Sequence, residues 1–172
     1  MSDAASYSAR EHLPDGSQVE IRALRPEDES GMLAAVEQTG ARSLQRRFFA
    51  TKHHFSDRER AFFMNVDFRN HVALVVLATE AGQNAIVGGG RYIVFEPGRA
   101  EMAFMVVDAW QGRGIGSMLA RTLVALARSA DLAELTAEVL PENARMRSVF
   151  DKLGFASAKL DPHTIHLVLK LS

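Results

Sequence analysis

Residues 106–117 read VVDAWQGRGIGS, and the fold of the chain can be worked out from this stretch. An apolar run ends there, three glycines follow at every second position, and an amphipathic pattern begins after them. Glycine inside a regular element costs roughly 0.5–1 kcal/mol relative to alanine, so three close glycines need a physical reason. A strand, a glycine-rich turn and a helix together form an arrangement that binds phosphate, because the backbone amides at the helix start can approach an anion closely.

Four explanations of these glycines are open. A Walker A loop requires Gly-Lys-Ser/Thr, which the stretch lacks. A dinucleotide fingerprint requires G-x-G-x-x-G at the opening of a parallel sheet, whereas these glycines follow G-x-G-x-G and the strands expected before them are antiparallel. The pyrophosphate of coenzyme A is a third ligand. As a fourth explanation, the glycines serve only the close packing of a helix against a strand.

Short apolar or alternating runs predict strands on both sides of the glycines. The expected strands are residues 18–24, 72–78, 85–95, 100–107, 132–140, 155–160 and 164–170. Helices are expected where apolar residues recur at helical spacing or where capping residues occur. The expected helices are residues 26–38, 41–49, 115–126 and 143–153, and one that begins at Ser56. This order predicts an α+β fold with a mixed, mostly antiparallel sheet of about six or seven strands flanked by helices.

The N-terminal residues 1–16 are polar and end in the turn sequence PDG. We therefore expect a flexible N-terminal segment, followed by a single domain over residues 17–172.

Composition and charge exclude several classes of protein. The chain has 172 residues, 47% of them hydrophobic, and a net charge of −1, which argues against nucleic-acid binding. The absence of cysteine removes disulfides, thiolate metal sites and cysteine nucleophiles. The chain shows neither a secretory signal nor an apolar run long enough to span a membrane, so we expect a cytoplasmic protein. The adjacent His53 and His54 cannot face the same side of an element, and no metal is expected.

Residues 111–116 carry a resemblance to a known family. This segment, QGRGIG, matches the Gln/Arg-x-x-Gly-x-Gly/Ala motif of the GNAT superfamily of acyl-CoA-dependent N-acyltransferases. A helix that begins at Asn143 and the segment LGF at residues 153–155 resemble the same family. The resemblance covers about residues 18–170. It implies a three-layer GNAT fold with splayed central strands, and acetyl-CoA as the co-substrate.

The resemblance also implies how the co-substrate is held. Backbone amides of the glycine turn would bind the pyrophosphate, and the splayed strand before the turn would accept the pantetheine arm as a pseudo-strand. A backbone amide of that strand would polarise the thioester carbonyl. The implied cofactor-binding residues are Met105, Val106, Val107, Gln111, Gly112, Arg113, Gly114, Ile115, Gly116, Ser117 and Asn143.

Glu101 is the candidate catalytic residue. Residues 100–116 resemble the matching segment of bacterial protein-lysine acetyltransferases, in which the glutamate at this position is the general base. A base is needed because a free lysine amine, with a pKa near 10.4, is protonated at neutral pH. Partial burial would raise the pKa of Glu101 and make it a better base. Without the family, Glu101 is simply an exposed glutamate at the start of a strand.

One position departs from the family pattern. Many GNAT enzymes carry a tyrosine seven residues after the asparagine to protonate the leaving thiolate, and here that position holds Phe150. A thiol with a pKa near 8.5 can leave as the thiolate or take its proton from water, so activity does not require the tyrosine. Because no cysteine can carry an acyl group, we expect direct transfer to an amine in a ternary complex. That amine is either a protein lysine or a small molecule.

Other interpretations stay open beside this one. A non-catalytic module that senses coenzyme A would explain the missing tyrosine, and a dinucleotide-binding domain is disfavoured by the glycine spacing. Residues 42–49 resemble the S-x-x-x-RFF segment of the lysine-acetyltransferase-like subgroup, near the acceptor site, but a solvated basic helix face explains them equally well. A homodimer is expected only by analogy with the superfamily.

Overall fold

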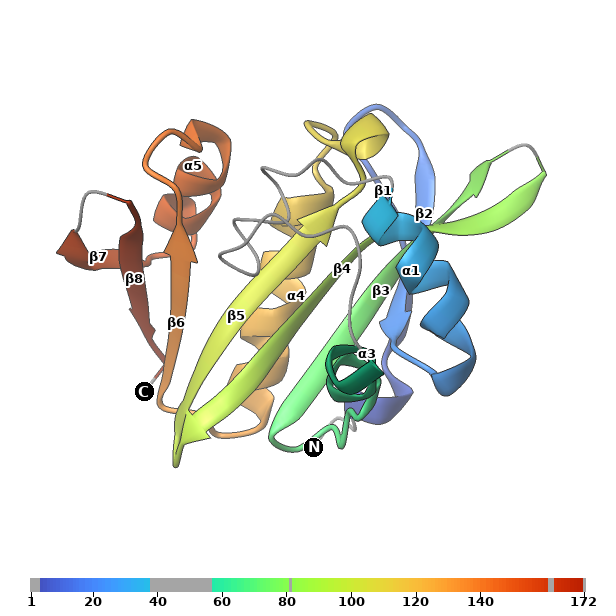
Figure 1. The fold of residues 1–172 in the computed structure, drawn as a ribbon. Coiled ribbons are helices and arrows are strands. Elements are labelled where there is room, and N and C mark those ends of the chain that lie inside the picture. Colours follow the sequence, from blue (N-terminus) through green and yellow to red (C-terminus); the bar gives the residue numbers. More distant parts are fainter. Residues whose placement is uncertain (1–3, 38–56, 81, 161–162, 172) are drawn as a thin grey trace.

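A computed structural model describes residues 4–37, 57–80, 82–160 and 163–171. Within these ranges eight strands form one sheet, in the order β1-β2-β3-β4-β5-β6-β8-β7 (Figure 1). The strands are β1 (Ser8–His12), β2 (Gln18–Ala23), β3 (His71–Glu80), β4 (Gln83–Glu96), β5 (Arg99–Val106), β6 (Glu134–Val139), β7 (Ala156–Leu160) and β8 (Ile165–Lys170). Every neighbouring pair is antiparallel except β5 and β6. The expected α+β fold is confirmed, with one strand more than expected.

The additional strand is β1, which lies inside the N-terminal segment that the sequence predicts to be flexible. It pairs with β2 from Ser8 opposite Arg22 to His12 opposite Gln18. None of its residues is buried and most are polar, so it lacks the apolar pattern by which the other strands are recognised. The ladder is made by backbone groups, which every residue carries, and the sequence pattern therefore does not predict β1.

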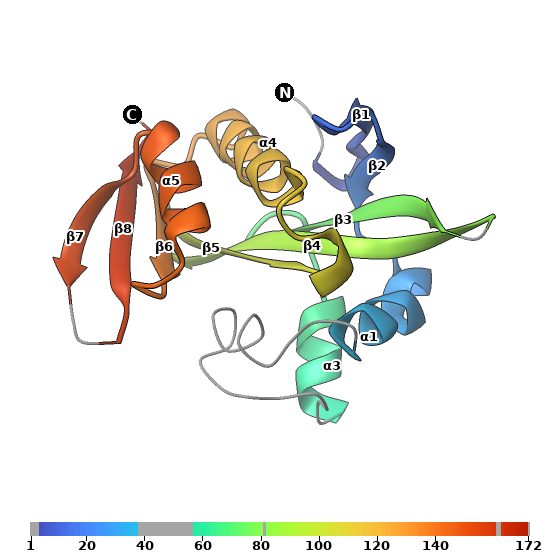
Figure 2. The same cartoon turned by 90° about the horizontal axis from the view of Figure 1, so that it is seen from above.

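Helices cover both faces of the sheet, which completes the three layers. The helices are α1 (Glu29–Glu37), α3 (Asp57–Met64), α4 (Ile115–Ser129) and α5 (Ala144–Lys152), with short 3-10 turns at Ala4–Ser6, Pro26–Asp28 and Asp108–Trp110. Figure 2 shows α4 and α5 on one face and α1 and α3 on the other. None of the helices in the described ranges is long and apolar enough to cross a membrane. The helix expected at residues 41–49 lies outside those ranges.

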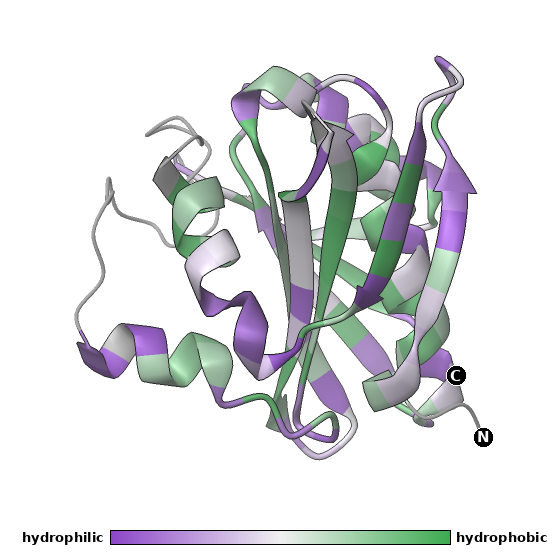
Figure 3. Cartoon of the chain, turned by 90° about the vertical axis from the view of Figure 1, so that its right-hand side faces the viewer, coloured by the Kyte–Doolittle hydropathy of each residue, from purple (hydrophilic) through white to green (hydrophobic). Residues whose placement is uncertain are grey.

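Helix α4 packs unusually close to β4, and glycines in the strand make room for it. A Cβ atom on Gly88 would lie 3.1 Å from Cγ2 of Ile115, and one on Gly90 would lie 3.1 Å from Cδ1 of Leu123. Ile115 and Leu123 are completely buried. Hydrophobic residues run along the strands, and the helices carry alternating hydrophobic and hydrophilic bands (Figure 3). Burial of this amphipathic face, rather than helix propensity, holds α4 in place.

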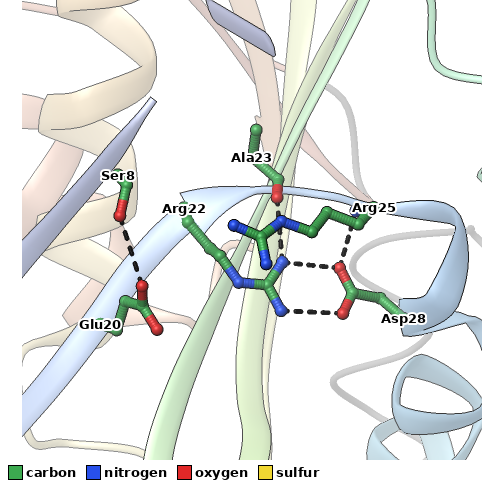
Figure 4. Close-up of polar contacts among 6 residues, drawn as sticks. All are labelled: Ser8, Glu20, Arg22, Ala23, Arg25 and Asp28. Carbon is green, nitrogen blue, oxygen red and sulfur yellow. Dashed lines mark hydrogen bonds and ion pairs between the residues drawn. The ribbon is translucent and has the colours of Figure 1, made fainter. Parts of the chain in front are cut away.

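A buried ion pair fixes the connection between β2 and α1. Arg22 donates two hydrogen bonds to Asp28, NH1 to Oδ2 at 2.8 Å and NH2 to Oδ1 at 2.9 Å (Figure 4). The backbone N–H of Arg25 donates to Oδ2 of Asp28 at 2.7 Å, and Arg22 also donates to the carbonyl of Ala23. Both charged side chains are more than nine-tenths buried, so each depends on the other to remain ionised.

The central strands β5 and β6 diverge after a short ladder. Their pairing runs from Arg99 opposite Glu134 to Met102 opposite Ala137 and stops there. Strand β5 continues to Val106 and β6 to Val139, and Figure 1 shows the two strands separating as they go on. The splayed central strands of the expected fold are therefore confirmed. The described edge of β5 beyond Met102 has no neighbouring strand on this side.

Candidate functional site

A cavity of about 690 Å³ opens where β5 and β6 separate. Its walls are the second half of β5, the glycine turn, the start of α4, the end of β6 and the first two turns of α5. Of the residues that the sequence singles out, it brings together Glu101, Met105, Val106, Gln111, Gly112, Gly114, Ile115, Gly116, Ser117 and Asn143. Val107 and Arg113 do not line it.

The phase of the β4–β5 ladder decides which backbone amides face the cavity. The N–H of Val107 donates to the carbonyl of Val87 at 2.9 Å, so Val107 points toward β4. Because amides alternate in direction along an antiparallel strand, those of Phe104 and Val106 point the other way, toward the gap. The carbonyl of Val106 accepts a hydrogen bond from Nε2 of Gln111 at 3.1 Å on that side. The exposed strand edge therefore belongs to Phe104 and Val106 rather than to Val107.

The glycine turn presents bare backbone at the start of α4. Gly112 and Gly114 have φ angles of +76° and +100°, in the left-handed region that favours glycine. The helical hydrogen bonds begin with the N–H of Met118 and the carbonyl of Gly114. The amides of residues 115–117 lie before that bond, at the positive end of the helix dipole.

Side chains of α5 close over the turn from the other side of the cavity. A Cβ atom on Gly112 would lie 2.8 Å from NH1 of Arg145, and one on Gly116 would lie 3.1 Å from Sδ of Met146. Any larger residue at either position would therefore occupy the space between the turn and α5. The bare amides of the turn and the guanidinium of Arg145 beside them suit an anion such as a phosphate group.

Arg113 points out of the cavity, toward the turn between β1 and β2. It donates to Oδ2 of Asp15 and to Oγ of Ser17, at 3.0 and 2.8 Å, and its guanidinium lies 3.9 Å from the ring centroid of Trp110. Hydrogen bonds from Ser17 and from Arg113 lower the pKa of Asp15 to about 2. The side chain of Arg113 thus ties the glycine turn to a hairpin almost a hundred residues earlier in the chain.

Asn143 and Phe150 both belong to α5. Asn143 is the N-cap of the helix, where Oδ1 accepts from the N–H of Met146 at 3.3 Å, and it lines the cavity from a buried position. Phe150 is only 3% exposed and packs against Phe104 and Phe155, with ring centroids 5.6 and 5.0 Å apart. The place of the family's tyrosine is therefore part of an aromatic cluster.

Glu101 lines the cavity from the face that carries α1 and α3. Side chains alternate along β5, and Met105 also borders a small apolar cavity of about 50 Å³ beneath these two helices, so the odd-numbered residues face them. The sequence predicts partial burial for Glu101. The structure instead places Glu101 in an exposed position.

Several cavity residues escape sequence reasoning. Glu138 follows Ala137, the last residue of β6 that pairs with β5, and its carboxylate lies 3.0 Å from Nδ1 of His166. Arg145 also lines the cavity. Its place two residues after the expected helix cap at Asn143 is the one signal in the sequence that could have predicted this. Residues 42–49, His53 and His54 lie outside the described ranges.

Comparison with known proteins decides the family. The model of the acetyltransferase (GNAT) family matches residues 35–155, which is more than half of the chain. The chain belongs to this family. The GNAT fold and the acetyltransferase names of its relatives make it an N-acetyltransferase, which favours an enzyme over a sensing module.

Two curated relatives are each 30% identical to this GNAT chain. An acetyltransferase of Pseudomonas aeruginosa matches over 153 residues, 88% of this chain and 82% of the relative. Acetyltransferase Pat of Mycolicibacterium smegmatis matches over 139 residues, 78% of this chain but 40% of the relative. The chain therefore spans about two fifths of the length of Pat. These matches support the resemblance to the protein-lysine-acetyltransferase-like subgroup.

Solved structures agree with the GNAT assignment. The crystal structure of the GNAT domain of S. lividans PAT superposes with a TM-score of 0.84 at 29% identity, covering 95% of this chain and 96% of that one. A Salmonella typhimurium protein solved with its cofactor acetyl-CoA gives a TM-score of 0.71 at 17% identity, covering 90% and 94%. The second likeness concerns the fold alone.

Proposed function

We propose that this GNAT chain transfers an acetyl group from acetyl-CoA directly to a primary amine in the cavity between β5 and β6. One observation carries the proposal: β5 loses its neighbour after Met102, and the freed edge runs from just beyond Glu101 to the glycine turn. A backbone edge, an anion site and a carboxylate thus follow one another along a single strand. These are the groups that acetyl transfer from a phosphorylated thioester requires.

The glycine turn would hold the pyrophosphate. The amides of Gly112 and Gly114 and those of residues 115–117 offer donors at the positive end of α4. The left-handed φ angles at Gly112 and Gly114 aim the backbone without a side chain in the way. The bound acetyl-CoA of the Salmonella typhimurium neighbour, which has the same fold, supports this co-substrate.

The freed edge of β5 would take the pantetheine arm. Glu101 and Val106 are five residues apart, which corresponds to about 17 Å of extended strand. The arm contains two amide groups, and these can pair with the outward amides of Phe104 and Val106 and the outward carbonyl of Phe104 as an added strand would. One of these N–H groups would also polarise the thioester carbonyl and stabilise the charge that develops on its oxygen. Asn143 lines the opposite wall.

Glu101 would act as the general base. The acceptor ammonium gives one proton to the carboxylate of Glu101, directly or through a water molecule, and the neutral amine attacks the thioester carbonyl. A C–N bond forms, the C–S bond breaks, and the thiolate of coenzyme A leaves. The second amine proton then goes to the thiolate or to solvent, so Phe150 is not required to supply one.

The acceptor would approach from the face that carries α1 and α3. Glu101 lies on that face, whereas the glycine turn and α5 lie toward the other. This arrangement keeps the two substrates on opposite sides of the sheet and lets them meet through the gap. The acceptor amine is either a protein lysine, as the resemblance to the protein-lysine-acetyltransferase-like subgroup implies, or a small-molecule amine.

Calorimetric titration of the purified chain with acetyl-CoA tests the proposal first, with NADH as the matched dinucleotide control. We expect saturable binding of acetyl-CoA with a dissociation constant on the order of micromolar, and no binding of NADH. Binding of NADH without acetyl-CoA would restore the dinucleotide explanation of the glycines. Failure of both to bind would leave the turn with a packing role.

A further inference from the structure

Two arginines flank the glycine turn, and they differ in whether their donors are already engaged. Arg113, inside the motif, is bound by Asp15 and Ser17 and stacks on Trp110. Arg145, outside the motif, lies in the first turn of α5 and lines the cavity. The arginine inside the motif is therefore not the arginine that lines the cavity.

The guanidinium of Arg145 lies in close contact with the backbone of Gly112. The position of a Cβ atom on Gly112 is 2.8, 3.2 and 3.4 Å from NH1, Cζ and NH2 of Arg145. Among the described residues, Arg145 makes no hydrogen bond or ion pair with another side chain. Its five N–H donors are thus available beside the backbone amides of the turn.

We infer that Arg145 binds the pyrophosphate of acetyl-CoA, and that Arg113 is a structural residue which fastens the turn to the hairpin of β1 and β2. The inference rests on the proposed function, because acetyl-CoA is its ligand. A guanidinium binds phosphate oxygens through two parallel hydrogen bonds, which are roughly twice as strong as neutral ones. Arg145 would close the pyrophosphate against the amides of the turn from the α5 side.

The test compares three single variants of the whole chain: Arg145→Gln, Arg113→Gln and Arg147→Gln. Arg147 is the matched control, because it lies on the same helix, donates to the carbonyl of Pro141 and does not line the cavity. We expect Arg145→Gln to weaken acetyl-CoA binding about ten-fold and to make the affinity less sensitive to salt, with an unchanged melting temperature. Arg147→Gln should bind as the wild type does.

Arg113→Gln should behave differently from Arg145→Gln. We expect a lower melting temperature, because Asp15 and Ser17 lose their partner, while the salt dependence of acetyl-CoA binding stays as in the wild type. Loss of affinity in Arg113→Gln at an unchanged melting temperature, together with normal binding by Arg145→Gln, would overturn the inference and reverse the two roles.

A second ligand identifies which phosphate Arg145 contacts. Coenzyme A also carries a 3′-phosphate, and 3′-dephospho-CoA lacks it. If Arg145 binds the pyrophosphate, Arg145→Gln weakens the binding of both ligands about equally. If it weakens only the binding of coenzyme A, Arg145 holds the 3′-phosphate and the assignment to the pyrophosphate is wrong. A wild-type chain that binds neither ligand would contradict the proposed function itself.

Discussion

Strand β5 has one closed edge and one open edge, and the two edges do different work. Toward β4 the ladder extends over the whole strand, from Arg99 to Val106. Toward β6 it ends at Met102. Buried backbone groups are expected to be paired, so an unpaired half-edge beside a cavity is a place prepared for a ligand. The comparison teaches that one strand can serve stability on one side and binding on the other.

Replacement of the proposed base, which lies next to the open edge of β5, should have the largest effect. Glu101→Gln keeps the size of the side chain but cannot accept the amine proton, and we expect turnover to fall roughly 100- to 10,000-fold. Steady-state acetylation of a lysine-peptide library, with coenzyme A release as the readout, would measure it. Acetyl-CoA affinity should stay within a factor of two.

Glu96→Gln is the control, at the end of β4, which pairs with the closed edge of β5. Glu96 pairs with Arg99 at the β4–β5 hairpin and does not line the cavity, so turnover should not change. Equal activity of Glu101→Gln and the wild type would remove Glu101 from the mechanism and point to another base, such as Glu138.

Removal of the buried carboxylate between β2 and α1 should lower the stability of the fold instead. Asp28→Ala leaves Arg22 buried without its partner, and we expect a loss of about 3–5 kcal/mol in the free energy of unfolding. Urea denaturation would measure it. Asp57→Ala removes an exposed carboxylate, whose 4.0 Å ion pair with Arg60 should contribute little. Equal losses in both variants would mean that burial does not distinguish the two pairs.

The loss of folding stability at low pH also reports on the buried pair of Arg22 and Asp28. Burial opposes ionisation of Asp28, but hydrogen bonds from Arg22 and from the amide of Arg25 outweigh it and hold its pKa below the ordinary value of 3.8. A carboxyl group with a lowered folded-state pKa stabilises the fold above its unfolded pKa, and this contribution is lost as the pH falls through the folded value. Asp28→Asn should therefore lose less stability than the wild type between pH 7 and about pH 3.

Two glycine variants are expected to have the smallest effects. One of them should change both stability and binding, the other stability alone. Gly112→Ala and Gly82→Ala each place a side chain at a φ near +80°, so both should lose about 1–2 kcal/mol of stability. A Cβ atom on Gly82 meets nothing within 4 Å, whereas one on Gly112 meets Arg145. Only Gly112→Ala should weaken acetyl-CoA binding, by about ten-fold in calorimetry. The same loss in Gly82→Ala would attribute it to stability rather than to the turn.

Patterns that are local in the sequence predicted most of the fold. The glycine turn, the amphipathic α4 and the antiparallel strands before them all leave such patterns, and so does the helix capped by Asn143. Strand β1 leaves none, because polar residues can form a ladder as well as apolar ones.

The details of the candidate site that the sequence did not predict depend on contacts between distant residues. Whether Val106 or Val107 offers its amide depends on the phase of pairing with β4, which no single-strand pattern reveals. The sequence alone does not show that the donors of Arg113 are engaged, because their partner Asp15 lies almost a hundred residues away and is brought close only by folding. The exposure of Glu101 is likewise a property of the assembled cavity.

The short β5–β6 ladder also has a consequence for how the molecule opens. In the described part of the chain, β6, β7 and β8 pair with the rest of the sheet from Arg99–Glu134 to Met102–Ala137. Such a block can exchange its amide hydrogens by a local opening that leaves β1 to β5 intact. A pantetheine arm in the gap would bridge the two blocks, so acetyl-CoA should slow hydrogen exchange in β6 and β8 more than in β2 and β3. The co-substrate would then be a temporary part of the sheet, present only while the enzyme is loaded.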